Sequence, residues 1–170
     1  MLSGLGKVAG LRAGGFSCAL KGWAVLNEPV LMAEAELKWH EKFKFEAKID
    51  GFPSLLMDEP REIGGDASGL SPLDLLAASI GGCLSAALMF CFRKARLSPQ
   101  GVSVKSKAVV VRENGYLRVK NVDVELNVEL DSETAKKAEQ CLSIFRNYCI
   151  VTESVIRGIP VNLEIKTHQK

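Results

Sequence analysis

The stretch SPLDLLAASIGGCLSAALMFCFRKARLS, residues 71–98, decides how this chain folds. Its apolar residues cover more than one helical face, which is typical of a helix buried on most sides. A start signal is present in Ser71, Pro72 and Asp74, because a serine cap, a proline at the first helical position and an acidic residue three positions after the cap all favour helix initiation. The sequence therefore predicts a long helix that runs to about Ala95.

Two adjacent glycines, Gly81 and Gly82, interrupt this helix at its centre, directly before Cys83. Each glycine lowers helix stability by roughly 0.8–1.0 kcal/mol relative to alanine. The pair indicates either very close packing by another backbone or a need for space beside Cys83. The residues around the cysteine are small, which leaves a hollow large enough for a substrate or a second sulfur.

The segments around this helix predict strands and one further helical region. Apolar and polar residues alternate in residues 33–49, and Asp50-Gly51 marks a turn before a short strand. Asn114-Gly115 between two alternating runs is a strong hairpin signal. A second helix is expected to be capped by Asp131 or Ser132, to break near Asn147, to restart through Cys149–Ile156, and to be followed by a strand over residues 160–166. This order of elements predicts one α+β domain.

Composition excludes several classes of function. The chain has 170 residues, 47% apolar and 25% charged, with a net charge of +2 and no basic stripe, so no nucleic-acid partner is expected. No run of about 20 apolar residues is present, so no membrane span is expected. We expect residues 1–31 to be an N-terminal extension of unknown role and residues 32–170 to form the domain. The lack of a secretory signal and the odd number of cysteines favour a cytoplasmic protein.

The five cysteines differ in their settings. None forms a CxxC pair and neither histidine lies near one in sequence, so no metal site and no cofactor are expected. Cys91 and Cys141 lie in apolar helical patterns and are expected to be buried and inert. If Asn147 caps the restarted helix, Cys149 lies in its first turn, where backbone N–H groups and the helix dipole favour a thiolate. Cys83 and Cys149 therefore could form a redox pair.

Three motifs resemble the OsmC/Ohr family of thiol peroxidases. They are SPLDLLAASIGGC (residues 71–83), the preceding loop MDEPREIGGDASG (57–69), and YCIVTESVIRGIPVNLEI (148–165). The resemblance covers roughly residues 33–166. It implies an OsmC-like fold, with antiparallel sheets around a long buried central helix, in an intertwined homodimer with its active sites between subunits.

The resemblance also implies an activity, that of a hydroperoxide reductase acting through two cysteines. Cys83 would be the thiolate that attacks the peroxide and becomes a sulfenic acid. Cys149 would resolve it as a disulfide, which an external dithiol reduces. An apolar pocket built from Leu76, Ile80 and Leu84, with Phe43 or Phe45 from the strands, would favour organic hydroperoxides.

The same resemblance implies an acidic residue and an arginine that hold the thiolate. Asp74 is the candidate for the acid, although its position nine residues before Cys83 places it on the opposite helix face and equally suits a capping role. Arg61 is the candidate for the arginine, and a solvated loop arginine is its other interpretation. Ile150 replaces the proline that usually follows the second cysteine.

A second hypothesis comes from a different class of protein. The same fold also suits a non-catalytic dimer that binds a small molecule or serves a structural role, with Cys83 silent in redox chemistry. The rate at which Cys83 is alkylated at neutral pH, relative to free cysteine, separates the two hypotheses.

Overall fold

The computed structural model describes residues 31–169. The chain divides into two units, Met1–Ala35 and Glu36–Lys170, and all the described helices and strands belong to the second. The expected N-terminal extension and Cys18 lie almost wholly outside the described residues, so the boundary at residue 31 stays a prediction.

Helix α2 (Pro72–Ala95) is the central element, as predicted. Its start is a capping box, in which the Asp74 amide donates to Ser71 Oγ at 3.2 Å and the Ser71 amide donates to Asp74 Oδ2 at 2.9 Å. The helix ends at Arg96, which adopts the left-handed conformation. By length and composition α2 could cross a membrane, but it packs against β4, β5, α3 and α4 as a partly buried core helix.

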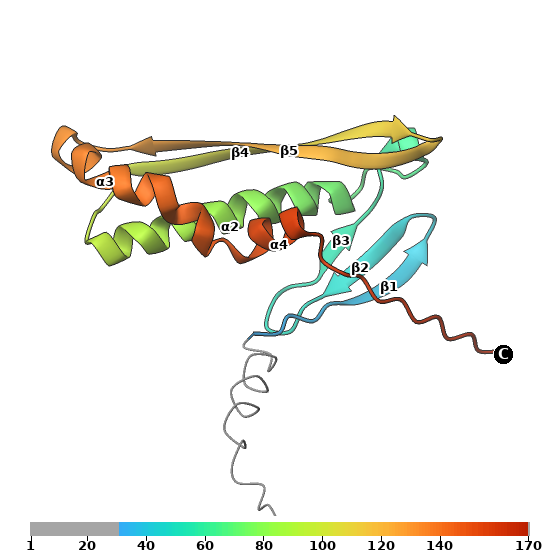
Figure 1. Ribbon diagram of the computed structural model, residues 1–170. Helices are drawn as coiled ribbons and strands as arrows, with labels where there is room; N and C mark the ends of the chain where they lie inside the picture. Colours follow the sequence, from blue (N-terminus) through green and yellow to red (C-terminus); the bar gives the residue numbers. More distant parts are fainter. Residues whose placement is uncertain (1–30, 170) are drawn as a thin grey trace, which may run out of the picture. The chain divides into compact units, whose positions relative to one another are not determined.

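The hairpin β4 (Gly101–Glu113) and β5 (Tyr116–Glu129) covers one side of α2 (Figure 1). The strands are antiparallel and turn at Asn114-Gly115, where both residues have positive φ. The predicted hairpin is therefore confirmed.

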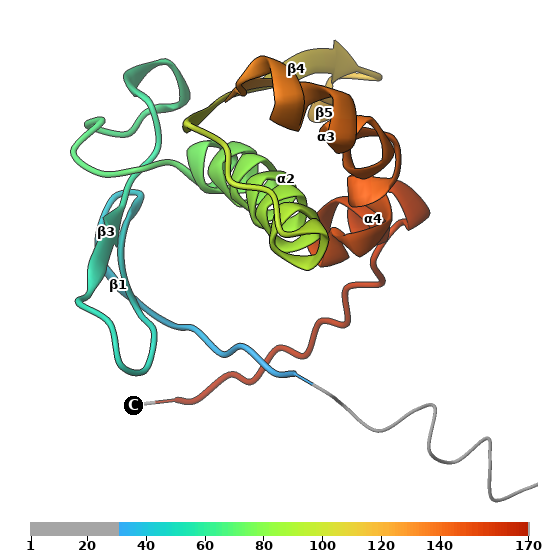
Figure 2. The same cartoon turned by 90° about the vertical axis from the view of Figure 1, so that its left-hand side faces the viewer.

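A second side of α2 is covered by α3 (Ser132–Ile144), the 3₁₀ turn η3 (Phe145–Tyr148) and α4 (Ile150–Arg157), which follow one another along it (Figure 2). Asp131 is the cap of α3, since its carboxylate accepts the amides of residues 133 and 134. The expected cap at Asn147 is wrong. Cys149 itself is the N-cap of α4, because η3 continues to Tyr148 and helical dihedrals resume only at Ile150.

A separate antiparallel sheet contains β1 (Glu36–Glu41), β2 (Lys44–Lys48) and β3 (Leu55–Met57), in that order. The sequence pattern suggested one alternating stretch over residues 33–49. The structure instead divides it into two strands, because Lys42 adopts a positive φ of 45° and the chain reverses there.

The loop between β3 and α2 is organised by a buried carboxylate. Asp58 is 1% exposed and accepts the amides of Glu59, Asp66 and Ser68, at 2.9–3.1 Å, and the Ser68 hydroxyl at 2.8 Å. These bonds hold the pKa of Asp58 below its usual value, with the Ser68 amide contributing most and burial opposing. The loop therefore delivers the chain to the start of α2 in a defined conformation.

The predicted C-terminal strand is not formed. Residues 158–169 run as an extended, unpaired segment (Figure 2). Its apolar side chains are exposed, from 57% for Ile159 to 90% for Val161. A strand requires a neighbour for its N–H and C=O groups, and the described part of this chain offers it none.

The first of the two central glycines is explained by packing against β4. A Cβ on Gly81 would lie 2.1 Å from Ser106 Oγ and 3.2 Å from Val104 Cγ1, whereas a Cβ on Gly82 would meet nothing within 4 Å. Close approach therefore accounts for Gly81, and Gly82 faces open space.

We expect Gly81→Ala to lower the free energy of unfolding by about 1–3 kcal/mol, because the new methyl group overpacks the contact with β4. Urea denaturation followed by circular dichroism measures the loss. Gly82→Ala is the matched control and should be neutral or slightly stabilising, since alanine is the better helix former. Adding Ser106→Ala to Gly81→Ala should restore part of the stability. Equal stability of the two glycine variants would contradict this account.

Candidate redox site

Cys83 and Cys149 meet where the middle of α2 faces the start of α4. Their side chains pack against each other, although 66 positions separate them in the sequence. Both belong to one apolar cluster, in which they pack with Ile80, Leu84 and Ala87 of α2. The structure therefore brings together the two cysteines that the sequence singled out.

Cys149 is held as the cap of α4. The Thr152 amide donates to Cys149 Sγ at 3.4 Å, and the Thr152 hydroxyl oxygen lies 3.0 Å from the same sulfur. Burial by itself raises the pKa of this thiol, which is only 1% exposed. The hydrogen bonds from Cys83 and Thr152 outweigh burial and bring the pKa of Cys149 below its ordinary value.

Cys83 is the more exposed of the two cysteines, and its pKa is shifted in the opposite direction. Burial, followed by the contact with Cys149, raises the pKa of Cys83. The Val151 amide opposes this shift, since it donates to Cys83 Sγ at 3.4 Å. When the pair carries one negative charge, that charge is therefore favoured on Cys149, with Cys83 as its hydrogen-bond donor.

Thr152 is a site residue that was not predicted from the sequence. Its hydroxyl and its amide both lie at Cys149 because it occupies the third helical position after the cap. The signal in the sequence was the spacing of Cys149 and Thr152, which matches that of a capping residue and its N3 partner. Placing the cap at Asn147 hid that spacing.

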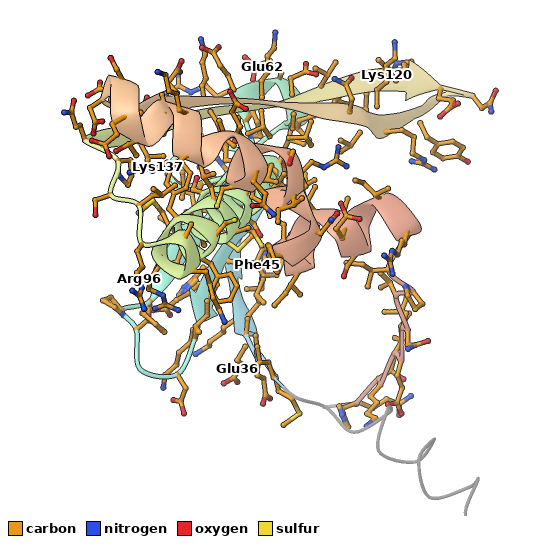
Figure 3. The ribbon with its side chains drawn as sticks, turned by 60° about the vertical axis from the view of Figure 1, so that its left-hand side comes forward. Glu36, Phe45, Glu62, Arg96, Lys120 and Lys137 are labelled. Atoms are coloured by element: carbon orange, nitrogen blue, oxygen red, sulfur yellow. The ribbon has the colours of Figure 1, made fainter. Side chains whose placement is uncertain are left out.

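An apolar pocket of about 550 Å³ lies beside this cluster. Leu76, Ile80 and Leu84 line it as predicted, but Phe43 and Phe45 do not, and neither cysteine is among its lining residues. Phe45 belongs to β2 (Figure 3), in the separate sheet. The remaining wall comes from β5, η3 and α4, and includes Val122, Val124, Thr152, Val155, Ile156 and, at its polar edge, Lys120 and Arg146.

The two other predicted site residues lie apart from the sulfurs. Asp74 accepts hydrogen bonds from Ser71, and borders a small pocket with Gly82 and Ser106 on the β4 side of α2. Arg61 opens the 3₁₀ turn η2 (Arg61–Ile63), with no ion pair or side-chain hydrogen bond among residues 31–169. Their catalytic roles stay predictions. The capping role of Asp74 is confirmed.

We expect Thr152→Val to raise the pH at which the Cys149 thiolate forms, because valine keeps the shape of threonine but has no hydroxyl to donate. The thiolate fraction at neutral pH should fall about tenfold, the scale of one lost hydrogen bond to a charged group. The measurement is a titration of thiolate absorbance, assigned by its difference from Cys149→Ser. Thr152→Ser keeps the hydroxyl and should titrate like the native protein. An unchanged midpoint in Thr152→Val would contradict a role for the hydroxyl.

The comparisons with known proteins agree with this geometry. A protein-family model described as OsmC-like protein matches residues 65–164, which include both cysteines and the whole of α2. A search of curated proteins found no significant match.

Solved structures similar to this chain share its fold. An OsmC-like protein from Mycoplasma pneumoniae has a TM-score of 0.63 at 14% identity, with 77% of this chain and 91% of that chain covered. An organic hydroperoxide resistance protein from Legionella pneumophila has a TM-score of 0.58 at 20% identity, covering 77% and 93%. One from Elizabethkingia anophelis has a TM-score of 0.58 at 20% identity, covering 78% and 92%. The expected α+β fold, with antiparallel sheets and a long helix, is confirmed.

Proposed function

Because the chain belongs to the OsmC-like family, we propose that it is a thiol-dependent hydroperoxide reductase that uses Cys83 and Cys149 and prefers organic hydroperoxides. One observation carries the proposal: the two thiols pack together at the start of α4, where backbone N–H groups face both sulfurs. Some structural relatives are hydroperoxide resistance proteins, which agrees with this chemistry.

The first step is attack by Cys83 on the peroxide. Cys83 is the more exposed thiol, so it is the one that the substrate meets. Its proton passes along the hydrogen bond to the Cys149 thiolate as its sulfur attacks the terminal oxygen of ROOH. The O–O bond breaks, Cys83 becomes a sulfenic acid, and the alkoxide takes the proton from Cys149 and leaves as the alcohol.

The second step joins the two sulfurs. The Cys149 thiolate, free of its proton again, attacks the Cys83 sulfur, and hydroxide leaves and is protonated to water. The product is a disulfide, which an external dithiol reduces by two successive exchanges. No cofactor or metal takes part. A cytoplasmic location suits the cycle, because reducing conditions there return the pair to the dithiol.

Backbone N–H groups at the start of α4 provide part of the thiolate stabilisation that was expected from an arginine. The amide of Val151 donates to Cys83 Sγ, and that of Thr152 donates to Cys149 Sγ. These groups carry the positive end of the helix dipole and favour negative charge on either sulfur. We propose that Asp74 and Arg61 act on the thiolate in the assembled dimer.

Substrate preference follows from the apolar pocket. Leu76, Ile80 and Leu84 lie on α2 next to the cysteine cluster, so an alkyl group of a bound peroxide has an apolar wall to contact. Each methylene buried there contributes about 0.8 kcal/mol. Hydrogen peroxide gains none of this free energy.

We also propose that the chain works as an intertwined homodimer. In the most apolar part of α2 only 39% of residues are buried, and the exposed positions form a stripe along one face. The stripe consists of Ala78, Gly82, Ala86 and Met89, and shallow hollows border it. The C-terminal segment presents a second apolar, unpaired surface. A second copy of the chain can cover both surfaces, whereas residues 31–169 of one copy cover neither.

The peroxidase hypothesis is tested by steady-state turnover with dithiothreitol or lipoamide as reductant. Native protein should reduce an alkyl hydroperoxide more efficiently than hydrogen peroxide, by about tenfold for every two methylenes buried. Cys83→Ser should fall to the background rate. Cys149→Ser should lose turnover and accumulate over-oxidised Cys83, and Cys18→Ser is the control. Native protein that shows no turnover above background would leave the non-catalytic binding dimer as the function.

The dimer is tested with Gly82→Arg. A Cβ at this position meets nothing within 4 Å among residues 31–169, so a long charged side chain can extend from it into open space, where it would obstruct a partner packed on the exposed face of α2. We expect this variant to elute as a folded monomer in size-exclusion chromatography with light scattering. Gln140→Arg, which adds the same charge on the exposed face of α3, should remain dimeric. A native protein that is monomeric at micromolar concentration contradicts the proposal.

A further inference from the structure

We propose that this chain contains a second redox-active dithiol, Cys91 and Cys141, which forms a disulfide between α2 and α3 independently of Cys83 and Cys149. From the sequence, both residues are expected to be inert, because each lies in an apolar helical pattern. Their positions in the fold give them a different role.

The two thiols face each other inside one core cluster. Cys91 is 6% exposed and Cys141 is 4% exposed, and both pack with Leu88, Phe92 and Ala138. Their sulfur atoms lie close enough to be bonded, although both are present as free thiols. The proposal rests on this contact between α2 and α3, because a disulfide forms only where the fold already holds two cysteines close together.

The chemistry of the second pair needs an oxidant, for which a small-molecule disulfide RSSR suffices. The Cys91 or Cys141 thiol loses its proton, and the thiolate attacks one sulfur of RSSR and releases RS⁻. The other cysteine then attacks the resulting mixed disulfide and releases the second RS⁻. Two electrons pass from the cysteines to RSSR, and the two protons end on two molecules of RSH.

The first pair does not relay electrons to the second. Cys91 follows Cys83 by eight residues, which separates them by about 12 Å along α2. Direct exchange between the pairs would require the helix to unwind. The second disulfide acts instead as a clamp, because Cys141 lies on α3, which leads through η3 to Cys149. It fixes the base of the segment that carries Cys149 and leaves Cys149 itself free.

The experiment uses the full chain with Cys18, Cys83 and Cys149 all changed to serine, so that only the second pair remains. The folded, reduced protein is treated with hydroxyethyl disulfide and then digested for peptide mapping. We expect loss of both thiols, a peptide linked through Cys91–Cys141, and no dimer band without reductant. The bond closes a loop of about 50 residues, so the melting temperature should rise by roughly 8–16 °C.

The matched control adds Cys141→Ala, which should abolish the linked peptide and the rise in melting temperature. The native chain provides a second measurement that needs no multiple variant. After oxidation, its disulfide map should contain Cys91–Cys141 together with Cys83–Cys149. Two thiols that stay free at saturating oxidant, a disulfide only between chains, or a linkage formed without a higher melting temperature would each overturn the proposal. None of these outcomes affects the peroxidase hypothesis, which is decided by turnover through Cys83.

Discussion

The hydrogen bonds at the start of α4 are the constraint on which the site depends. Cys149 has to lie at the N-cap for its sulfur to accept the Thr152 amide, and α4 has to pack on α2 for the next amide to reach Cys83. Both conditions require η3 to end one residue before Cys149. A helix that began two residues earlier would turn Cys149 into an ordinary buried side chain.

The elements that the sequence predicted well are those determined by local interactions. The start of α2 follows from Ser71, Pro72 and Asp74, and the hairpin from Asn114-Gly115, whose positive φ angles match the turn. The cap of α4 was predicted wrongly because a 3₁₀ turn intervenes, and such a turn depends on packing against α2. The strand over residues 160–166 failed for a related reason, since a strand also requires a neighbour.

The two cysteines of the site could be predicted from the sequence, but the residues around them could be predicted only in part. Cys83 was identified by its small neighbours and by family resemblance, and Cys149 by its position near a helix start. The sequence gives no distance between segments, so it did not show that Cys91 and Cys141 face each other. The pocket wall from β5 and α4 also arises from tertiary packing. Tertiary packing also separates Gly81 from Gly82. The two glycines lie on different faces of α2, so close packing explains only Gly81.

The capping role of Cys149 links chemistry to secondary structure. Helix α4 has only eight residues, and so short a helix is marginal without its cap and its packing. The sulfur that accepts the Thr152 amide is the same atom that a disulfide would turn toward Cys83. Oxidation would therefore uncap α4 and loosen its first turn, and reduction would restore it. A partner that contacts the surface of α4 would therefore meet a longer helix in the reduced protein than in the oxidised protein.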